Sequence, residues 1–200
     1  LETSDIIADE NSLFFSNNKN QFFSIDIKSG SFNWETTVNS SIRPTLIENF
    51  LISVSIEGYL ILIDKITGNI IKVTDVFQNF NPKKRNKIFP TGFIVGTKNI
   101  YLSTNIGRLL VIDIKSGNFN WETTVNSNIR PTLIENFLIS VSLEGYLILI
   151  DKITGNIIKV TDVFQNFNPK KRKQILPTGF IVGTKNIYLS TNIGRMLVVD

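Results

Sequence analysis

The sequence predicts an all-β fold built from repeated four-stranded antiparallel sheets. The main observation is a tandem repeat with a period of 87 residues, which divides the chain into residues 1–87, 88–174 and 175–200. Inside each repeat, the turn signature Asp-x-x-[Ser/Thr]-Gly recurs at alternating spacings of 38 and 49 residues. The mean spacing is close to the roughly 40–45 residues of one β-propeller blade. Each 87-residue repeat is therefore expected to hold two propeller blades.

Short segments rich in Val, Ile, Leu and Phe, separated by Asn, Gly and Pro, mark the expected strands. In the second blade we expect them at residues 44–48, 50–55, 59–64 and 70–76. The blades are expected at about residues 4–38, 43–76, 91–125 and 130–163, with three strands of a fifth at 178–200, or about 4.5 blades. The runs at 60–63 and 109–112 are apolar at every position, which is typical of strands covered on both faces. The chain is thus expected to be a single propeller or part of one.

Two sets of residues are expected to have structural roles. The Asp of each turn signature can accept backbone N–H groups, and the Gly tolerates a positive φ, so each signature should close a hairpin. A calcium site is disfavoured because each turn supplies a single carboxylate. Trp34 and Trp121 are expected to act as wedges between blades rather than as a cofactor platform. The turn residues are Asp26, Gly30, Asp64, Gly68, Asp113, Gly117, Asp151 and Gly155.

Composition argues against most kinds of chemistry. The chain has no cysteine and no histidine, which excludes thiolate nucleophiles, disulfides, His-based acid–base catalysis and the usual zinc sites. No paired acid and base is recognisable, so we expect no enzyme and no catalytic, cofactor or metal residues. The net charge of +4 is only mildly basic, and no aromatic residues alternate with the basic ones, so nucleic acid is not an expected partner. The sequence has no apolar run long enough for a membrane span and no leader at its start, so neither is expected.

Two groups of basic residues are the candidate partner-binding sites. The first lies in the connection after the second blade of each repeat, which is about 11 residues longer than its counterpart. Extra length on a propeller face commonly builds a binding surface, and its charge would attract an acidic or phosphate-rich partner. The alternative is a solvated loop that maintains solubility, with Phe80 and Phe167 packing it onto the blade. The second group, just before the innermost strand, is expected either to line a central channel mouth or to pair with a carboxylate such as Glu48. The candidates are Lys83, Lys84, Arg85, Lys170, Lys171 and Arg172 in the first group, and Arg43 and Arg130 in the second.

The segment 107–121, which reads Gly-Arg-Leu-Leu-Val-Ile-Asp-Ile-Lys-Ser-Gly-Asn-Phe-Asn-Trp, resembles the repeat of PQQ-like, quinoprotein-type β-propellers. The Arg-Pro-Thr-Leu-Ile segments at 43–47 and 130–134 are similar to the innermost strand of that family. Within the family, the chain is most similar to the BamB-type lipoproteins of the bacterial outer-membrane β-barrel assembly machinery. Two departures matter. Lys72 and Lys159 stand where the repeat has Trp, which is expected to weaken docking between blades, and the acylated cysteine of the lipoproteins is not in this chain.

This resemblance implies a non-enzymatic scaffold for protein–protein interaction in the periplasm or at the periplasmic face of the outer membrane. Its implied partners are periplasmic domains of the assembly machinery. Quinoprotein dehydrogenases of the wider family hold their quinone with a vicinal cysteine pair, so the absence of cysteine implies that no cofactor is bound. The near-identity of the copies supports an alternative, an engineered or recently amplified propeller without an evolved ligand. Because an open sheet edge invites pairing, the three-stranded fifth blade leads us to expect a homodimer that closes the ring.

Overall fold

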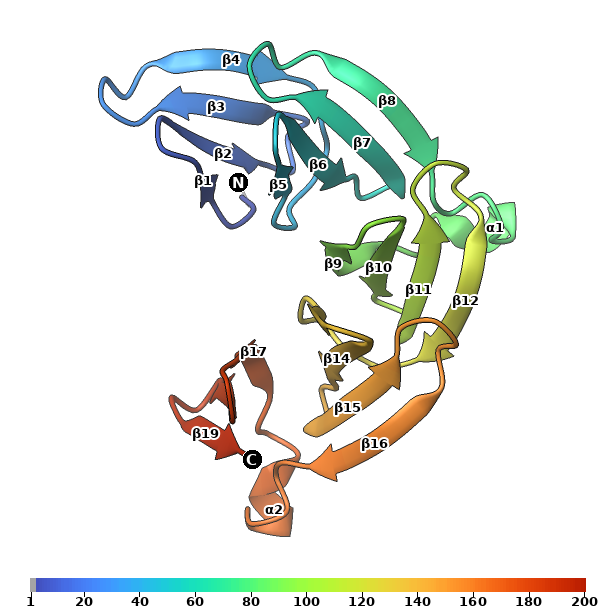
Figure 1. Ribbon diagram of the computed structural model, residues 1–200. Helices are drawn as coiled ribbons and strands as arrows, with labels where there is room; N and C mark the ends of the chain where they lie inside the picture. Colours follow the sequence, from blue (N-terminus) through green and yellow to red (C-terminus); the bar gives the residue numbers. More distant parts are fainter. Residues whose placement is uncertain (1–2) are drawn as a thin grey trace. The chain divides into compact units, whose positions relative to one another are not determined.

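The strands of this computed structural model, which describes residues 3–200, form four antiparallel sheets of four strands and one of three (Figure 1). In each sheet the strands pair in chain order. The first sheet comprises β1 (Ile7–Ala8), β2 (Ser12–Ser16), β3 (Phe22–Asp26) and β4 (Phe32–Thr36). The second comprises β5 (Thr45–Ile47), β6 (Phe50–Val54), β7 (Tyr59–Asp64) and β8 (Ile70–Asp75). This arrangement confirms the expected all-β fold of four-stranded antiparallel sheets.

The remaining sheets repeat the same order of strands. The third comprises β9 (Pro90–Val95), β10 (Asn99–Thr104), β11 (Arg108–Asp113) and β12 (Phe119–Thr124). The fourth comprises β13 (Thr132–Ile134), β14 (Phe137–Val141), β15 (Tyr146–Asp151) and β16 (Ile157–Asp162). The three-stranded sheet comprises β17 (Pro177–Val182), β18 (Ile187–Thr191) and β19 (Met196–Val199). Two helical turns, α1 (Pro82–Arg85) and α2 (Pro169–Arg172), follow β8 and β16. Within residues 3–200, no helix has both the length and the apolar character needed to span a membrane.

The chain divides into two compact units. The first unit extends to Pro90 and includes the turn Asp113–Asn118, and the second contains Thr91–Ile112 and Phe119–Asp200. The first unit therefore holds the sheets β1–β4 and β5–β8 with α1, and the second holds nearly all of the later strands with α2.

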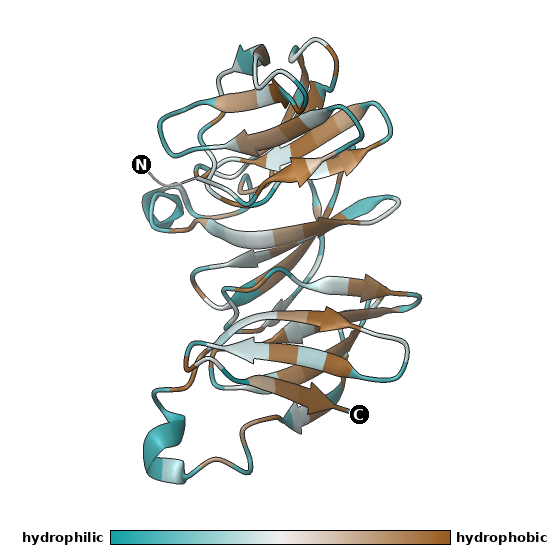
Figure 2. Ribbon diagram, turned by 90° about the vertical axis from the view of Figure 1, so that its left-hand side faces the viewer, coloured by the Kyte–Doolittle hydropathy of each residue, from teal (hydrophilic) through white to brown (hydrophobic). Residues whose placement is uncertain are grey.

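Each unit has an apolar core between neighbouring sheets, while the helical turns are hydrophilic (Figure 2). Alternate strand positions supply the core, because successive side chains of a strand point to opposite faces of the sheet. In the first unit, the core cluster of buried residues is Ile7, Phe14, Phe22, Val38, Leu51, Ile61 and Ile63. In the second unit, the corresponding cluster is Tyr101, Leu109, Val111, Val125, Leu138, Ile148 and Ile150. Six of the seven positions in each cluster are equivalent in the repeat, and Ile7 and Val111 are the exceptions, so most of the packing occurs twice.

The Asp-x-x-[Ser/Thr]-Gly signatures lie in the last hairpin of each four-stranded sheet. In the first of them, Asp26 Oδ1 accepts hydrogen bonds from the backbone N of Ser29 at 2.7 Å and of Lys28 at 3.1 Å. Gly30 has a φ of 71° and donates its N–H to the Asp26 carbonyl oxygen. The backbone and hydroxyl donors at Ser29 lower the pKa of Asp26 from its ordinary value of 3.8, and equivalent donors lower the pKa of the other three turn aspartates.

Acid is therefore expected to destabilise the protein through these turns. A carboxylate whose folded pKa is depressed contributes stability at higher pH, and that contribution is lost as the pH falls below 3.8 through the folded pKa. Denaturant unfolding midpoints measured on either side of that value would show a drop. The matched control is a variant with all four aspartates replaced by Asn, which retains an acceptor oxygen but does not titrate in this range. An equally large drop in the control would contradict the assignment.

The tryptophans contact neighbouring sheets within each unit. Trp34 Nε1 donates to the Lys65 carbonyl oxygen at 3.0 Å, and Trp121 Nε1 donates to the Lys152 carbonyl oxygen at 3.3 Å. The indole of Trp34 covers Gly68, whose φ is +73° and where an added Cβ would lie 2.6 Å from the ring. Each tryptophan thus docks on the Asp-x-x-Thr-Gly turn of the next sheet.

Lys72, which stands where the tryptophan is missing, makes a polar contact with the turn of the next sheet. Its Nζ donates to the Lys115 carbonyl oxygen at 2.7 Å. Lys115 lies two residues after the Asp of its turn, one position further along than Lys65 and Lys152, whose carbonyl oxygens accept from the tryptophans. The lysine therefore keeps the polar half of the contact and loses the aromatic half. The long side chain of Lys72 reaches the turn Asp113–Asn118 with its ammonium group but donates to a different carbonyl oxygen of the turn from the one the tryptophans use.

Replacing Lys72 with Met is expected to lower the free energy of unfolding by about 1 kcal/mol, since one exposed charge-assisted hydrogen bond is lost while the aliphatic stem is kept. Denaturant unfolding of the variant measures this loss. Lys19→Met is the control, because Lys19 is exposed and its side chain makes no hydrogen bond or ion pair among those found for the described residues, and it is expected to be close to neutral. Equal losses in the two variants would contradict the role given to Lys72.

Candidate functional site

The basic segment after the second sheet of each repeat contains a helical turn, which the sequence did not lead us to expect. In α1, the side chain of Asn81 accepts a hydrogen bond from Lys83 N at 3.0 Å, and Pro82 occupies the first helical position. In α2, Asn168 accepts from Lys170 N at 2.9 Å in the same way. Asn is a favoured N-cap and Pro is favoured at the first position, so Asn-Pro-Lys-Lys-Arg is itself the signal for this turn.

Phenylalanines anchor each helical turn to its sheet, as expected. Phe77 is fully buried, and its ring lies directly over Gly58, where an added Cβ would be 2.0 Å from Phe77 Cδ2. The ring of Phe80 packs edge-on against Phe77 with 5.5 Å between centroids. The second copy repeats the pair as Phe164 and Phe167 at 5.6 Å. The backbone before the helical turn is thereby fixed in place.

The arginine that ends each helical turn is bound within the fold. Arg85 Nη1 lies 2.6 Å from Asp75 Oδ2, and the guanidinium carbon lies 5.4 Å from the centre of the Tyr59 ring. Nη2 also donates to the Glu57 carbonyl oxygen at 3.2 Å. In the second unit, Arg172 pairs with Asp162 at 2.7 Å and lies 5.7 Å from the centre of the Tyr146 ring.

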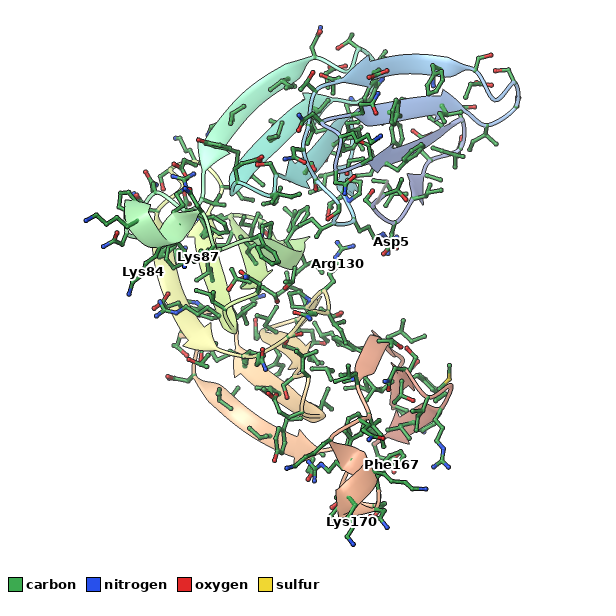
Figure 3. The ribbon with its side chains drawn as sticks, turned by 180° about the vertical axis from the view of Figure 1, so that it is seen from behind. Asp5, Lys84, Lys87, Arg130, Phe167 and Lys170 are labelled. Carbon is green, nitrogen blue, oxygen red and sulfur yellow. The ribbon has the colours of Figure 1, made fainter. Side chains whose placement is uncertain are left out.

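The lysines behave differently from the arginines. Lys83 and Lys84 on α1 are exposed, as are their counterparts Lys170 and Lys171 on α2. Lys84 and Lys170 extend away from the strands (Figure 3). The six candidates thus separate into two arginines that orient the helical turn and four lysines that are available to a partner. Neither the tyrosine nor the aspartate that holds each arginine was found from the sequence, although both recur with the 87-residue period.

A pocket of about 410 Å³ lies beside α1 in the first unit. It is lined by Ile56, Glu57, Tyr59, Arg85, Asn86, Ile88 and Phe89. Burial acts to raise the pKa of Glu57, but hydrogen bonds from Ser55 and Asn39 outweigh it and leave that pKa below its ordinary value, so this carboxylate is charged at neutral pH. Phe89 is 45% exposed and gives the rim an apolar contact. A surface with aromatic and apolar residues beside one carboxylate and one guanidinium suits a protein partner, because Tyr, Phe and Arg are enriched at interfaces.

The second group of candidates, Arg43 and Arg130, lies directly before β5 and β13. Arg43 is exposed, and the described residues show no ion pair between it and Glu48. The backbone of Arg130 packs closely on β9, where an added Cβ at Gly92 would lie 2.9 Å from Arg130 Cα. Among residues 3–200, no cluster of three or more metal-ligating side chains is present.

Comparison with known proteins identifies the family. A family profile described as outer membrane protein assembly factor BamB matches residues 2–74 and 81–161, which is most of the chain. The chain belongs to the BamB-type family of PQQ-like propeller repeats. The two matched segments follow the duplication, and the BamB-type profile resumes at the N-cap of α1. No curated protein sequence matches the chain.

Solved structures support the propeller fold of this BamB-type chain. The crystal structure of BamB from Moraxella catarrhalis matches with a TM-score of 0.73 at 16% identity, over 98% of this chain and 57% of that one. The computationally designed Ika8 protein matches with a TM-score of 0.66 at 13% identity, over 97% of this chain and 57% of that one. The designed Ika4 protein matches with a TM-score of 0.56 at 15% identity, over 78% of this chain and 87% of that one. The chain thus spans little more than half the length of the first two structures.

Proposed function

We propose that this chain is a non-enzymatic propeller scaffold that binds protein partners in outer-membrane β-barrel assembly. The family match supports this role, and with it a location in the periplasm or at the periplasmic face of the outer membrane. On this proposal the chain is a single propeller or part of one, with two blades in each 87-residue repeat. Its partners are periplasmic domains of the assembly machinery.

The observation that carries the proposal is the duplicated basic helical turn. Each copy presents two exposed lysines on a backbone fixed by a phenylalanine pair and by an arginine that is held by an aspartate and a tyrosine. A surface that is ordered before binding loses less conformational entropy when a partner docks. Exposed positive charge also speeds association with an acidic surface.

Binding of the purified periplasmic domains of the β-barrel assembly machinery tests the proposal. We expect the chain to retain at least one domain at low salt, and retention to fall when Lys83, Lys84, Lys170 and Lys171 are all changed to Glu. The matched control changes Lys19, Lys28, Lys115 and Lys185 to Glu, which alters the net charge equally at exposed positions elsewhere. No retention of any domain, or equal losses in the two variants, would contradict the proposed surface.

A second candidate function is favoured by the near-identity of the two copies. Between Asp26 and Arg85 the first copy differs from the second at only three positions, and exposed positions match as well as buried ones. An evolved binding face would be expected to diversify between repeats. The alternative is therefore an engineered or recently amplified repeat propeller without a ligand, and the same binding experiment separates the two, because this candidate predicts no specific retention.

We further propose that the chain associates with a second copy of itself. Leu109 and Val111 are fully buried in the core between β9–β12 and β13–β16. Their counterparts one repeat later, Met196 and Val198, are 68% and 57% exposed. Light scattering is expected to give twice the chain mass of 22.6 kDa, and a Met196→Lys variant is expected to return the single-chain mass. A single-chain mass for the unaltered protein would contradict this association.

A further inference from the structure

The space beside Trp121 is a pocket in the second unit to which no role has been given. Its volume is about 430 Å³, within the roughly 300–1,000 Å³ typical of small-molecule sites. The pocket lies where the sheet β9–β12 meets the sheet β13–β16. Its neutral lining side chains are Thr97, Asn99, Tyr101, Asn120, Trp121, Leu133 and Ile153. Two lysines, Lys98 and Lys152, also line it, and no carboxylate is found among its described lining residues.

The first unit contains the equivalent pocket with a different charge balance. This pocket, of about 540 Å³, lies beside Trp34. Two carboxylates, Asp9 and Asp26, line it together with one ammonium group, that of Lys65. Lys65 Nζ lies 3.0 Å from Asp9 Oδ2. The cation of the first pocket is therefore already neutralised inside the protein.

Two substitutions between the copies account for the difference. Gly96 stands at the repeat position of Asp9, and Lys98 stands at that of Asn11. Lys152, the counterpart of Lys65, instead donates to the backbone carbonyl oxygen of Glu135. The second copy has thus lost the internal counter-ion and gained a second cation.

Gly96 also leaves the aromatic wall of the pocket uncovered. An added Cβ at this position would lie 3.1 Å from Tyr101 Cε2 and 3.4 Å from Leu133 Cδ1. Burial raises the pKa of Tyr101, so its hydroxyl stays protonated at neutral pH and keeps its hydrogen to donate. Asn120 Nδ2 donates to Asn99 Oδ1 at 2.8 Å, which fixes the two amides in place. The pocket therefore combines an apolar wall, oriented polar groups and unneutralised positive charge.

We propose that this pocket binds a small organic anion, a carboxylate attached to an aromatic or apolar body. The carboxylate lies between Lys98 and Lys152, and the body packs against Trp121 and Leu133. Charge-assisted hydrogen bonds to a carboxylate are the stronger ones in proteins, and an aromatic ring gains contact area against the indole. The pocket beside Trp34 does not bind this ligand. There Lys65 is already paired with Asp9, and the second carboxylate in the lining, that of Asp26, repels an anion.

Fluorine NMR of the protein labelled with 5-fluorotryptophan tests the proposal, because the chain has two tryptophans and each gives its own resonance. Trp34→Phe assigns them. On titration with phenylacetate, the Trp121 resonance is expected to shift saturably while the Trp34 resonance stays in place. The neutral analogue 2-phenylethanol is expected to leave both resonances unshifted. No shift at Trp121, an equal shift with the alcohol, or parallel shifts at both tryptophans would overturn the proposal.

Variants that exchange residues between the copies sharpen the test. Gly96→Asp restores the counter-ion and is expected to weaken phenylacetate binding at least about tenfold. Gly96→Ala adds bulk without charge and is expected to weaken binding less than Gly96→Asp does. Lys98→Asn, at an exposed position, is expected to weaken binding as well, with an unchanged Trp34 resonance showing that the protein is folded. The double variant Asp9→Gly with Asn11→Lys is expected to make the Trp34 resonance respond to phenylacetate. Unaltered affinity in both Gly96→Asp and Lys98→Asn would show that the charge is irrelevant and the proposal is wrong.

Discussion

Replacing Gly145 with alanine is expected to lower the free energy of unfolding by about 3–5 kcal/mol, from a strained backbone and a steric overlap acting together. Gly145 has a φ of +86°, a region that side chains rarely adopt. An added Cβ would also lie 2.1 Å from Phe164 Cδ2, and that ring is fully buried and cannot move without opening the core. Denaturant unfolding measures the loss.

Gly30→Ala separates the two causes. Gly30 has a φ of +71°, but an added Cβ there would have no atom within 4 Å. This control is expected to cost only about 1–2 kcal/mol, which is the backbone term alone. If the two variants were equally destabilised, the overlap with Phe164 would contribute nothing.

Replacing Trp34 with alanine is expected to lower the free energy of unfolding by about 2–4 kcal/mol, because a large, partly buried side chain is lost between two sheets. The indole stacks on Phe22 with 5.9 Å between ring centroids and covers Gly68 on the neighbouring sheet. It also donates its N–H to the Lys65 carbonyl oxygen. Denaturant unfolding of the variant measures the combined loss of the aromatic contact and of the hydrogen bond.

Trp34→Phe is the control that keeps most of the aromatic packing and removes the N–H donor. We expect it to cost about 1–2 kcal/mol. A loss as large as that of Trp34→Ala would mean that the hydrogen bond, rather than the packing, dominates the contact. That result would also predict that Lys72, which keeps only a hydrogen bond, docks its sheet as firmly as a tryptophan.

The fold could be predicted largely because the same pattern of strands and turns recurs in each repeat of the sequence. The alternation of turn signatures and short apolar strands fixes four-stranded sheets, since each turn places its aspartate and glycine where the hairpin requires them. The helical turns were missed because four residues are too few for an apolar periodicity, although the Asn-Pro pair was a usable signal. Two-residue β1 was beyond prediction for the same reason, as a pair of residues carries no pattern.

The candidate site was predicted less completely than the fold. The exposed lysines of α1 and α2 follow from charge alone, but the side chains that hold Arg85 come from another strand, and pairing partners ten residues apart are not visible in a charge pattern. The pocket beside Trp121 could have been noticed from the sequence, because Gly96 and Lys98 replace Asp9 and Asn11 in an otherwise aligned repeat. The alignment of the two copies could not show that Asp9 and Lys65 lie close enough to form an ion pair.

The sheets β5–β8 and β13–β16 are nearly identical in sequence, so a strand of one sheet can also pair with strands of the other sheet during folding. Strand β7 has the same six residues as β15, Tyr-Leu-Ile-Leu-Ile-Asp, so either can form the same hydrogen bonds with β6 or with β14. No contact energy distinguishes the correct partner, and only the length of the connecting chain does. Since loop-closure entropy grows slowly with length, the native pairing between neighbours is favoured over an exchanged one by only about 1–3 kcal/mol. At high protein concentration, strands of different molecules can form the same hydrogen bonds with one another. Such intermolecular pairing leads to misassembly, so the refolding yield should fall as the protein concentration rises.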